Sequence, residues 1–180
     1  MLSKIRHVAL VLSFGQLALP PAAVSQRSDN ATASSYADSC LPASEFQLRE
    51  IALHADGENA LEHLGKWVRI KTDSGEDDGG RYERQTYYFR DIEIEVVRGL
   101  VTRVATHSAG TATPSGLRPG LSRDAVRRLL LTKGVTSKQI GDTLEIAACS
   151  TEELALEDLI ELAFDRTGRV RAISMSSSSP

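Results

Sequence analysis

The chain has 180 residues, of which 41% are hydrophobic and 25% are charged. This composition is typical of one compact domain, or of two small ones that share a core. The formal net charge of −3 gives no indication of nucleic-acid binding, which usually needs a strongly basic face. No apolar run reaches the length of about 20 residues that crosses a bilayer, so we expect no membrane span.

The first 25 residues have the layout of a secretory signal peptide. Lys4 and Arg6 come before an apolar stretch at 8–19, and small residues follow. The sequence Ala23-Val24-Ser25 predicts cleavage after Ser25. No cysteine lies in the cleavage region, so we expect no lipid anchor. These features predict a periplasmic or secreted protein.

Residues 26–44 are small and polar without periodicity, which indicates a flexible leader that becomes ordered near Cys40. Near its end lies Cys40, whose only possible partner in the chain is Cys149. Disulfides persist in the oxidising compartments that exported proteins reach, so the pair predicts a disulfide; two buried free thiols are the alternative. No histidine lies at ligand spacing from either cysteine, and we expect no metal site.

Residues 45–110 form the first of two halves of the predicted fold and begin with a predicted bent strand at 45–53. A helix is predicted at 57–66 because apolar residues recur at helical spacing before Gly65, a natural C-cap. Three strands should follow, at 66–72, 84–90 and 92–105, the last with a tight turn at Arg98-Gly99. The acidic stretch 73–80 is predicted as a flexible hairpin loop, because its spacing does not match a calcium-binding loop.

The second half, residues 111–176, repeats this order. Ser122 is a good N-cap for a helix, and Asp124 lies in its first turn, where a carboxylate stabilises the helix dipole. A strand is predicted at 143–149, and a hairpin at 158–175 with Gly168 in its turn. Residues 177–180 are predicted to be a disordered tail.

The two halves also resemble each other in sequence. "IEIEVVRGLVTRV" at 92–104 resembles "IELAFDRTGRVRAI" at 160–173, and the helical segment 59–64 aligns with 124–129. Chance similarity of two hairpins would not also reproduce the preceding helix. We therefore predict an α+β fold of two tandem units, each a helix followed by three antiparallel strands, that bury one continuous core together.

The stretch "TPSGLRPGLSRDAVRRLL" at 113–130 carries a resemblance to known families. Its Gly120-Leu121-Ser122, followed by Val126 and Leu129-Leu130, resembles the helix entry of the SmpA/OmlA family of small outer-membrane assembly lipoproteins and of β-lactamase inhibitor protein-like domains. The resemblance covers roughly 113–175, and 45–105 more weakly. It implies a tandem α+β fold and a periplasmic or secreted setting. Leu131 stands where these families usually have a glycine, the lipidated cysteine is absent, and no inhibitor contact residue can be mapped.

No residue pattern predicts catalysis or a cofactor. His54, His63 and His107 are scattered, and the sequence has no HExxH or G-x-S-x-G motif. We therefore expect a protein that is not an enzyme.

Charged side chains are predicted on the sheet face opposite the apolar one: Arg90, Glu93, Glu95, Arg103, Glu161, Arg169 and Arg171. That face is either a solvated surface with cross-strand ion pairs or a concave binding surface.

The aromatic residues concentrate in the first half. Trp and Tyr are frequent among binding hot spots, so the candidate anchors are Trp67, Tyr82 and Tyr88, with polar contacts from Arg90 and Arg103. The predicted partner is another envelope or secreted protein, which would make the chain an inhibitor, an immunity protein or an accessory factor for envelope assembly. The alternative is a structural or stress-related periplasmic protein without a discrete site.

Overall fold

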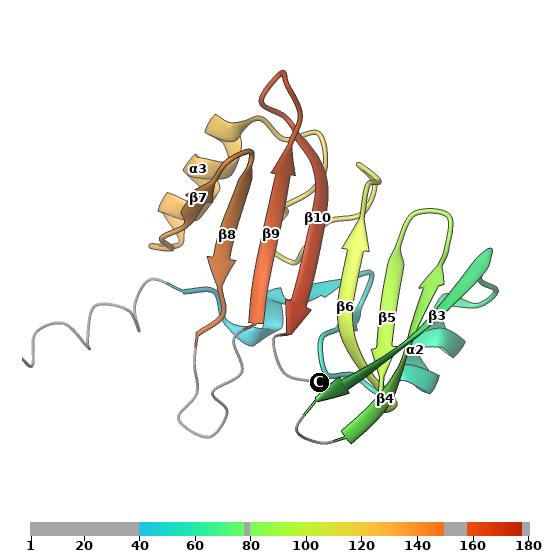
Figure 1. Ribbon diagram of the computed structural model, residues 1–180. Coiled ribbons are helices and arrows are strands. Elements are labelled where there is room, and N and C mark those ends of the chain that lie inside the picture. Colours follow the sequence, from blue (N-terminus) through green and yellow to red (C-terminus); the bar gives the residue numbers. More distant parts are fainter. Residues whose placement is uncertain (1–39, 78–79, 150–157, 178–180) are drawn as a thin grey trace, which may run out of the picture.

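The computed structural model describes residues 40–77, 80–149 and 158–177. They form an α+β fold in which one eight-stranded antiparallel sheet has two α-helices on the same face (Figure 1). The predicted α+β class is therefore confirmed. The predicted signal peptide, residues 26–39 of the predicted leader and residues 178–180 lie outside the described residues.

Each half of the chain contributes one α-helix and four strands to this arrangement. The first half contains the 3-10 helix η2 (Ala43–Glu45), β1 (Gln47–Leu48), β2 (Ile51–Ala52), α2 (Gly57–Leu64), β3 (Arg69–Asp77), β4 (Gly80–Tyr88), β5 (Glu93–Val97) and β6 (Leu100–Thr106). The second contains α3 (Arg123–Thr132), β7 (Lys138–Ile140), β8 (Thr143–Ala147), β9 (Asp158–Phe164) and β10 (Val170–Ser177). The strand order is β3-β4-β5-β6-β10-β9-β8-β7, so the last strands of the two halves pair at the centre.

The helix ends follow the local signals in the sequence. The Asp56 side chain caps α2 by accepting a hydrogen bond from the Asn59 amide at 2.9 Å, and Gly65 ends the helix with a φ of 77°. Ser122 caps α3 as predicted, accepting from the Ala125 amide at 3.2 Å. Counted from these two caps, Ala60 corresponds to Val126, which corrects the sequence alignment of the helices by one position.

Both helices begin against the turn that precedes the last strand of their own half. In the first half the Gly57 amide donates to the Gly99 carbonyl at 2.7 Å. In the second half the Arg123 amide donates to the Gly168 carbonyl at 3.0 Å. Gly99 and Gly168 have φ values of 81° and 74°, a region that costs glycine little, so the predicted turns are confirmed.

The core lies between the sheet and the layer formed by α2, α3 and the β1–β2 hairpin. Its fully buried side chains come from both halves, as the prediction of a continuous core requires: Phe46, Leu48, Ile92, Ile94, Val101, Leu117, Ile146, Ile160, Leu162, Ile173 and Met175. Burial of this apolar surface is the main term that stabilises the fold.

The disulfide between Cys40 and Cys149 is present and confirms the predicted pair. Beside it, the Leu41 amide donates to the Ala147 carbonyl at 3.1 Å, and the Cys149 amide donates to the Leu41 carbonyl at 2.8 Å. The Leu41 side chain is fully buried. The chain therefore belongs to the fold from Cys40 onward, near the residue where the leader was predicted to become ordered.

Three predicted elements differ from the structure. Residues 45–53 form a hairpin rather than one bent strand, because Arg49 and Glu50 have positive φ values of 51° and 66° and reverse the chain. The acidic stretch predicted as a loop is mostly strand, because β3 runs to Asp77 and pairs with β4. β7 was not predicted and gives the second half a fourth strand in the sheet, and β10 extends to Ser177. The first half also has four strands, because its predicted turn at Arg98-Gly99 divides residues 92–105 into β5 and β6.

Candidate functional site

The sheet has one face that neither helix covers, which we call the open face; it is turned toward the viewer in Figure 1. One row of direct cross-strand neighbours crosses this face over all eight strands. The row consists of Arg69, Tyr88, Glu93, Ala105, Ser174, Glu161, Glu145 and Lys138. Its centre has small side chains where β6 meets β10, and large polar or aromatic side chains lie to either side.

Two tyrosines stand on the open face in the half formed by β3–β6, each in contact with arginine. The Arg69 guanidinium lies over the Tyr88 ring, 3.9 Å from its centroid. The Tyr82 ring lies across Gly75, where a Cβ atom would come within 2.5 Å of the ring. The guanidinium carbons of Arg98 and Arg84 lie 5.3 and 5.7 Å from the Tyr82 centroid. Cation–π contacts of this kind hold both rings in place.

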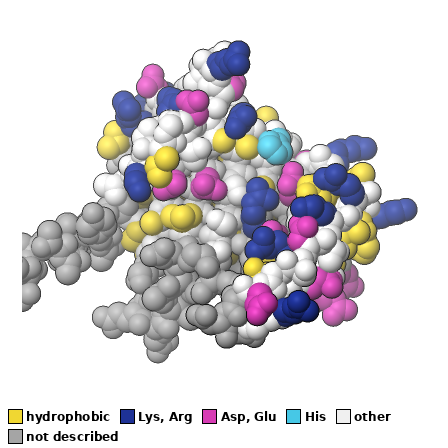
Figure 2. Space-filling model, in the orientation of Figure 1, with side chains coloured by type: hydrophobic (Ala, Val, Ile, Leu, Met, Phe, Trp, Pro, Cys, Tyr) yellow, Lys and Arg dark blue, Asp and Glu magenta, His cyan; other side chains and the backbone are white. Residues whose placement is uncertain are grey.

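Among the side chains that the structure describes, basic groups outnumber carboxylates around these tyrosines. The residues concerned are Arg69, Lys71, Arg84, Arg98 and Arg103 against Asp73, Glu93 and Glu95. Figure 2 shows Lys and Arg side chains gathered over the β3–β6 half of this face. The half therefore presents an aromatic surface with a positive surplus.

Arg103 is the central charged group of the open face. Its Nε donates to Ser174 Oγ at 3.0 Å, and its Nη1 lies 3.7 Å from Glu93 Oε2. The Nε of Arg84 lies 3.4 Å from Glu95 Oε1 but is buried and makes no hydrogen bond within the described residues. These ion pairs are long and partly solvated, so each contributes little to stability.

A hollow of about 380 Å³ opens where β5 begins and β6 ends, next to Glu93. His107 Nε2 lies 3.7 Å from Glu93 Oε1 at its wall. The hollow is lined by Phe89, Arg90, Asp91, Ile92, Glu93, Ala105, Thr106, His107 and Ser108. Because Glu93 is the cross-strand neighbour of Tyr88, the hollow and the tyrosine belong to one continuous surface.

Four of the five residues predicted from the sequence lie on the open face or in the hollow beside it, although they are not in contact with one another in any interaction described above. Tyr82, Tyr88 and Arg103 stand on the open face, and Arg90 lines the adjoining hollow. Trp67 is different, because its ring packs edge-on against Tyr87, a core residue, with centroids 5.3 Å apart. Trp67 therefore lies on the helix-bearing side and cannot share a surface with Tyr88.

Sequence reasoning missed Arg69, which covers Tyr88, and His107, which lines the hollow. The alternation of residues 69, 71 and 73 along β3 would have placed Arg69 on the tyrosine face if the strand pairing had been known. His107 lies past the end of β6, where alternation gives no signal.

In the second half, Glu161 stands on the open face as predicted. Arg169 does not, because its Nη1 donates to the Gly120 carbonyl at 2.9 Å, beside the start of α3.

A contact between the two halves joins His54 and Asp158, with His54 Nε2 3.0 Å from both carboxylate oxygens. Within the described ranges, no three His, Cys, Asp or Glu side chains are grouped closely enough to hold a metal ion. Nor does that part of the chain contain a helix long and apolar enough to cross a membrane.

Comparisons with known proteins give weak structural likenesses. No family model matches the sequence. An extracellular protein containing a SCP domain from Bacillus anthracis is 17% identical, with a TM-score of 0.45 over 70% of this chain and 44% of that one. The chain thus spans less than half the length of that protein. The uncharacterized protein YfeY from Escherichia coli is 13% identical, with a TM-score of 0.42 over 77% of this chain and 99% of that one.

Proposed function

We propose that the protein is an exported, non-enzymatic binding protein built from two tandem units, and that the β3–β6 half of its open face contacts a protein partner. Support for the tandem units comes from the matching order of a helix and four strands in each half. In both halves the N-cap residue also bridges to the start of the last strand, Asp56 to Leu100 and Ser122 to Arg169.

Export is supported by two independent features. The predicted signal peptide precedes the fold, and the disulfide between Cys40 and Cys149 is of the kind that persists outside the reducing cytosol. The proposed partner is therefore itself an envelope or secreted protein.

The observation that carries the binding role is the pair of arginine-stacked tyrosines on the sheet face opposite α2 and α3. Tyr and Arg are enriched among interface hot spots because both bury a large planar surface and keep a hydrogen-bonding group. The surplus of Arg and Lys around Tyr82 and Tyr88 fits a partner surface rich in carboxylates. Blocking of an exported enzyme and assistance in envelope assembly are both roles for such a surface.

The test is retention of a partner from the envelope and culture fluid of the source organism on the immobilised mature protein. Tyr88→Ala should weaken retention of the same protein that the wild type retains, since truncation of a central aromatic anchor commonly costs about 2 kcal/mol or more. Glu161→Ala, on the same face but in the second half, should leave it unchanged. Equal retention by wild type and Tyr88→Ala would refute the proposal.

A further inference from the structure

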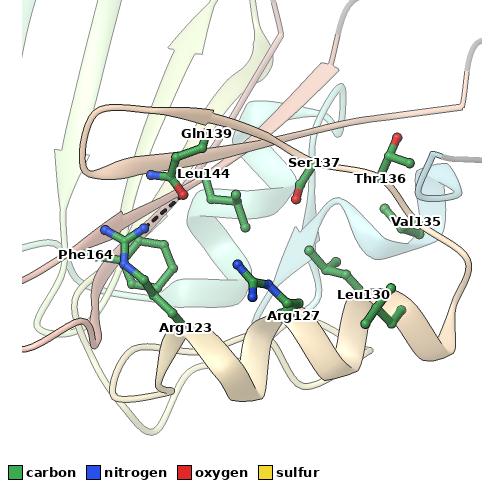
Figure 3. Close-up of a pocket in the computed structure, with 10 residues that line it drawn as sticks. Arg123, Arg127, Leu130, Val135, Thr136, Ser137, Gln139, Leu144 and Phe164 are labelled. Carbon is green, nitrogen blue, oxygen red and sulfur yellow. Dashed lines mark hydrogen bonds between the residues drawn. The ribbon is translucent and has the colours of Figure 1, made fainter.

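A pocket of about 420 Å³ lies on the helix-bearing side of the sheet, between α3 and the β7–β8 hairpin (Figure 3). It is separate from the open face. Its lining consists of Arg123, Arg127, Leu130, Leu131, Val135, Thr136, Ser137, Gln139, Leu144 and Phe164. The volume is in the range of roughly 300–1,000 Å³ that is typical of small-molecule sites.

The pocket exists because α3 covers the edge of the sheet incompletely. Val126 and Leu130 are buried and hold α3 on the core. The neighbouring stripe of the same helix, which contains Arg127 and Leu131, faces the β7–β8 hairpin instead. β7 is three exposed residues long, so it adds little bulk at this edge, and the Leu131 side chain is left 69% exposed.

The two arginines of the pocket have different surroundings. Arg123 is held by Gln139 Oε1 at 2.9 Å and Asp142 Oδ1 at 3.4 Å, with its guanidinium over the Phe164 ring at 4.1 Å. Arg127, one turn further along α3, is exposed and has no hydrogen-bond or ion-pair partner in the part of the chain that the structure describes. Figure 3 shows its guanidinium reaching into the space between α3 and Leu144.

The lining contains no carboxylate. An uncompensated guanidinium therefore lies over an apolar floor formed by Leu130, Val135 and Leu144. The corresponding position in the first helix, counted from the N-caps, is Leu61. The first half packs its helix on the sheet with a leucine at this position, so the packing itself does not require an arginine there.

We propose that this pocket binds a small amphiphilic carboxylate, a medium-chain fatty acid, with its carboxylate at Arg127 and its hydrocarbon chain against the leucines. Guanidinium groups bind carboxylates with directed, charge-assisted hydrogen bonds. Each methylene removed from water against Leu130 and Leu144 adds to the affinity. Arg123, which is held in place by Gln139 and Asp142, lines the same pocket, and the Ser137 hydroxyl lies on the opposite wall.

Calorimetric titration of the mature protein with sodium decanoate, kept below its micelle concentration, tests the proposal. Saturable binding to the wild type is expected, and Arg127→Gln should lower the affinity by about tenfold, the usual effect of losing one charge-assisted hydrogen bond. Arg128→Gln is the matched control, because Arg128 is exposed like Arg127 and lies next to it on α3 but does not line the pocket; the affinity of this variant should equal that of the wild type. Decyltrimethylammonium, a cation with the same chain, should bind more weakly than decanoate.

A second variant tests the place of the hydrocarbon chain. Ser137→Trp fills the pocket from its wall and should abolish decanoate binding, with far-UV circular dichroism used to confirm that the variant is folded. No saturable binding of decanoate to the wild type would overturn the proposal. Equal affinities of Arg127→Gln and Arg128→Gln, or full binding by folded Ser137→Trp, would overturn it as well.

Discussion

Replacing Cys40 and Cys149 together by serine should lower the melting temperature of the protein while leaving its fold in place. The disulfide joins residues 109 positions apart. Closing a loop of this length removes about 4–5 kcal/mol of chain entropy from the unfolded state. For a domain of this size, each kcal/mol changes the melting temperature by about 2–4 °C. The expected fall is therefore about 8–20 °C.

The folded state should survive because other contacts hold the same segment. Leu41 is fully buried, and its amide and carbonyl groups pair with Ala147 and Cys149. Thermal unfolding is best followed by circular dichroism for the oxidised wild type, the reduced wild type and the double serine variant. Reduction should lower the wild-type melting temperature to that of the variant and leave the variant unchanged. Equal melting temperatures of variant and oxidised wild type would refute the loop-closure reasoning.

Two other predictions concern pH and processing. Burial raises the pKa of the Glu45 carboxyl, but hydrogen bonds from Lys133 Nζ and the Ser115 amide, both 2.8 Å, outweigh it and hold the pKa below its ordinary value. The pKa of Glu45 is lower in the folded state than in the unfolded state. The stability that the ionised carboxylate contributes is therefore complete above about pH 4.3 and is lost as the pH falls through the folded-state pKa. The free energy of unfolding of Glu45→Gln, measured over this pH range, should lack this part of the pH dependence. The intact mass of the exported protein should correspond to a chain that begins at Gln26, within two residues. Recovery of only the full-length chain would contradict the predicted signal peptide.

Local signals in the sequence were enough to predict the elements that depend on one residue's conformation. Ser122 caps α3, and Gly99 and Gly168 take the positive φ values that their turns require. The pairing of the cysteines followed from their number and from the export signal. The cap and the turns depend on the conformation of a few neighbouring residues, and the disulfide was predictable because the chain has only two cysteines.

The features that the sequence did not reveal depend on contacts between distant strands. β7, with the sequence KQI, has no apolar alternation and is a strand because it pairs with β8. Trp67 precedes β3, so alternation could not assign its face, and only its contact with Tyr87 does so. Likewise Arg69 meets Tyr88 only through the register of β3 and β4. The composition of the open face was therefore predictable in part, but not which side chains meet on it.

The most direct test of the proposed binding surface uses a photo-cross-linking amino acid, benzoylphenylalanine, at one of two aromatic positions on opposite faces of the sheet. Tyr88 lies on the open face and Trp67 on the helix-bearing side. If the open face binds the partner, irradiation in the presence of envelope and secreted proteins should give a covalent adduct from position 88 and none from position 67. An adduct from position 67 alone, or equal adducts from both positions, would contradict the account.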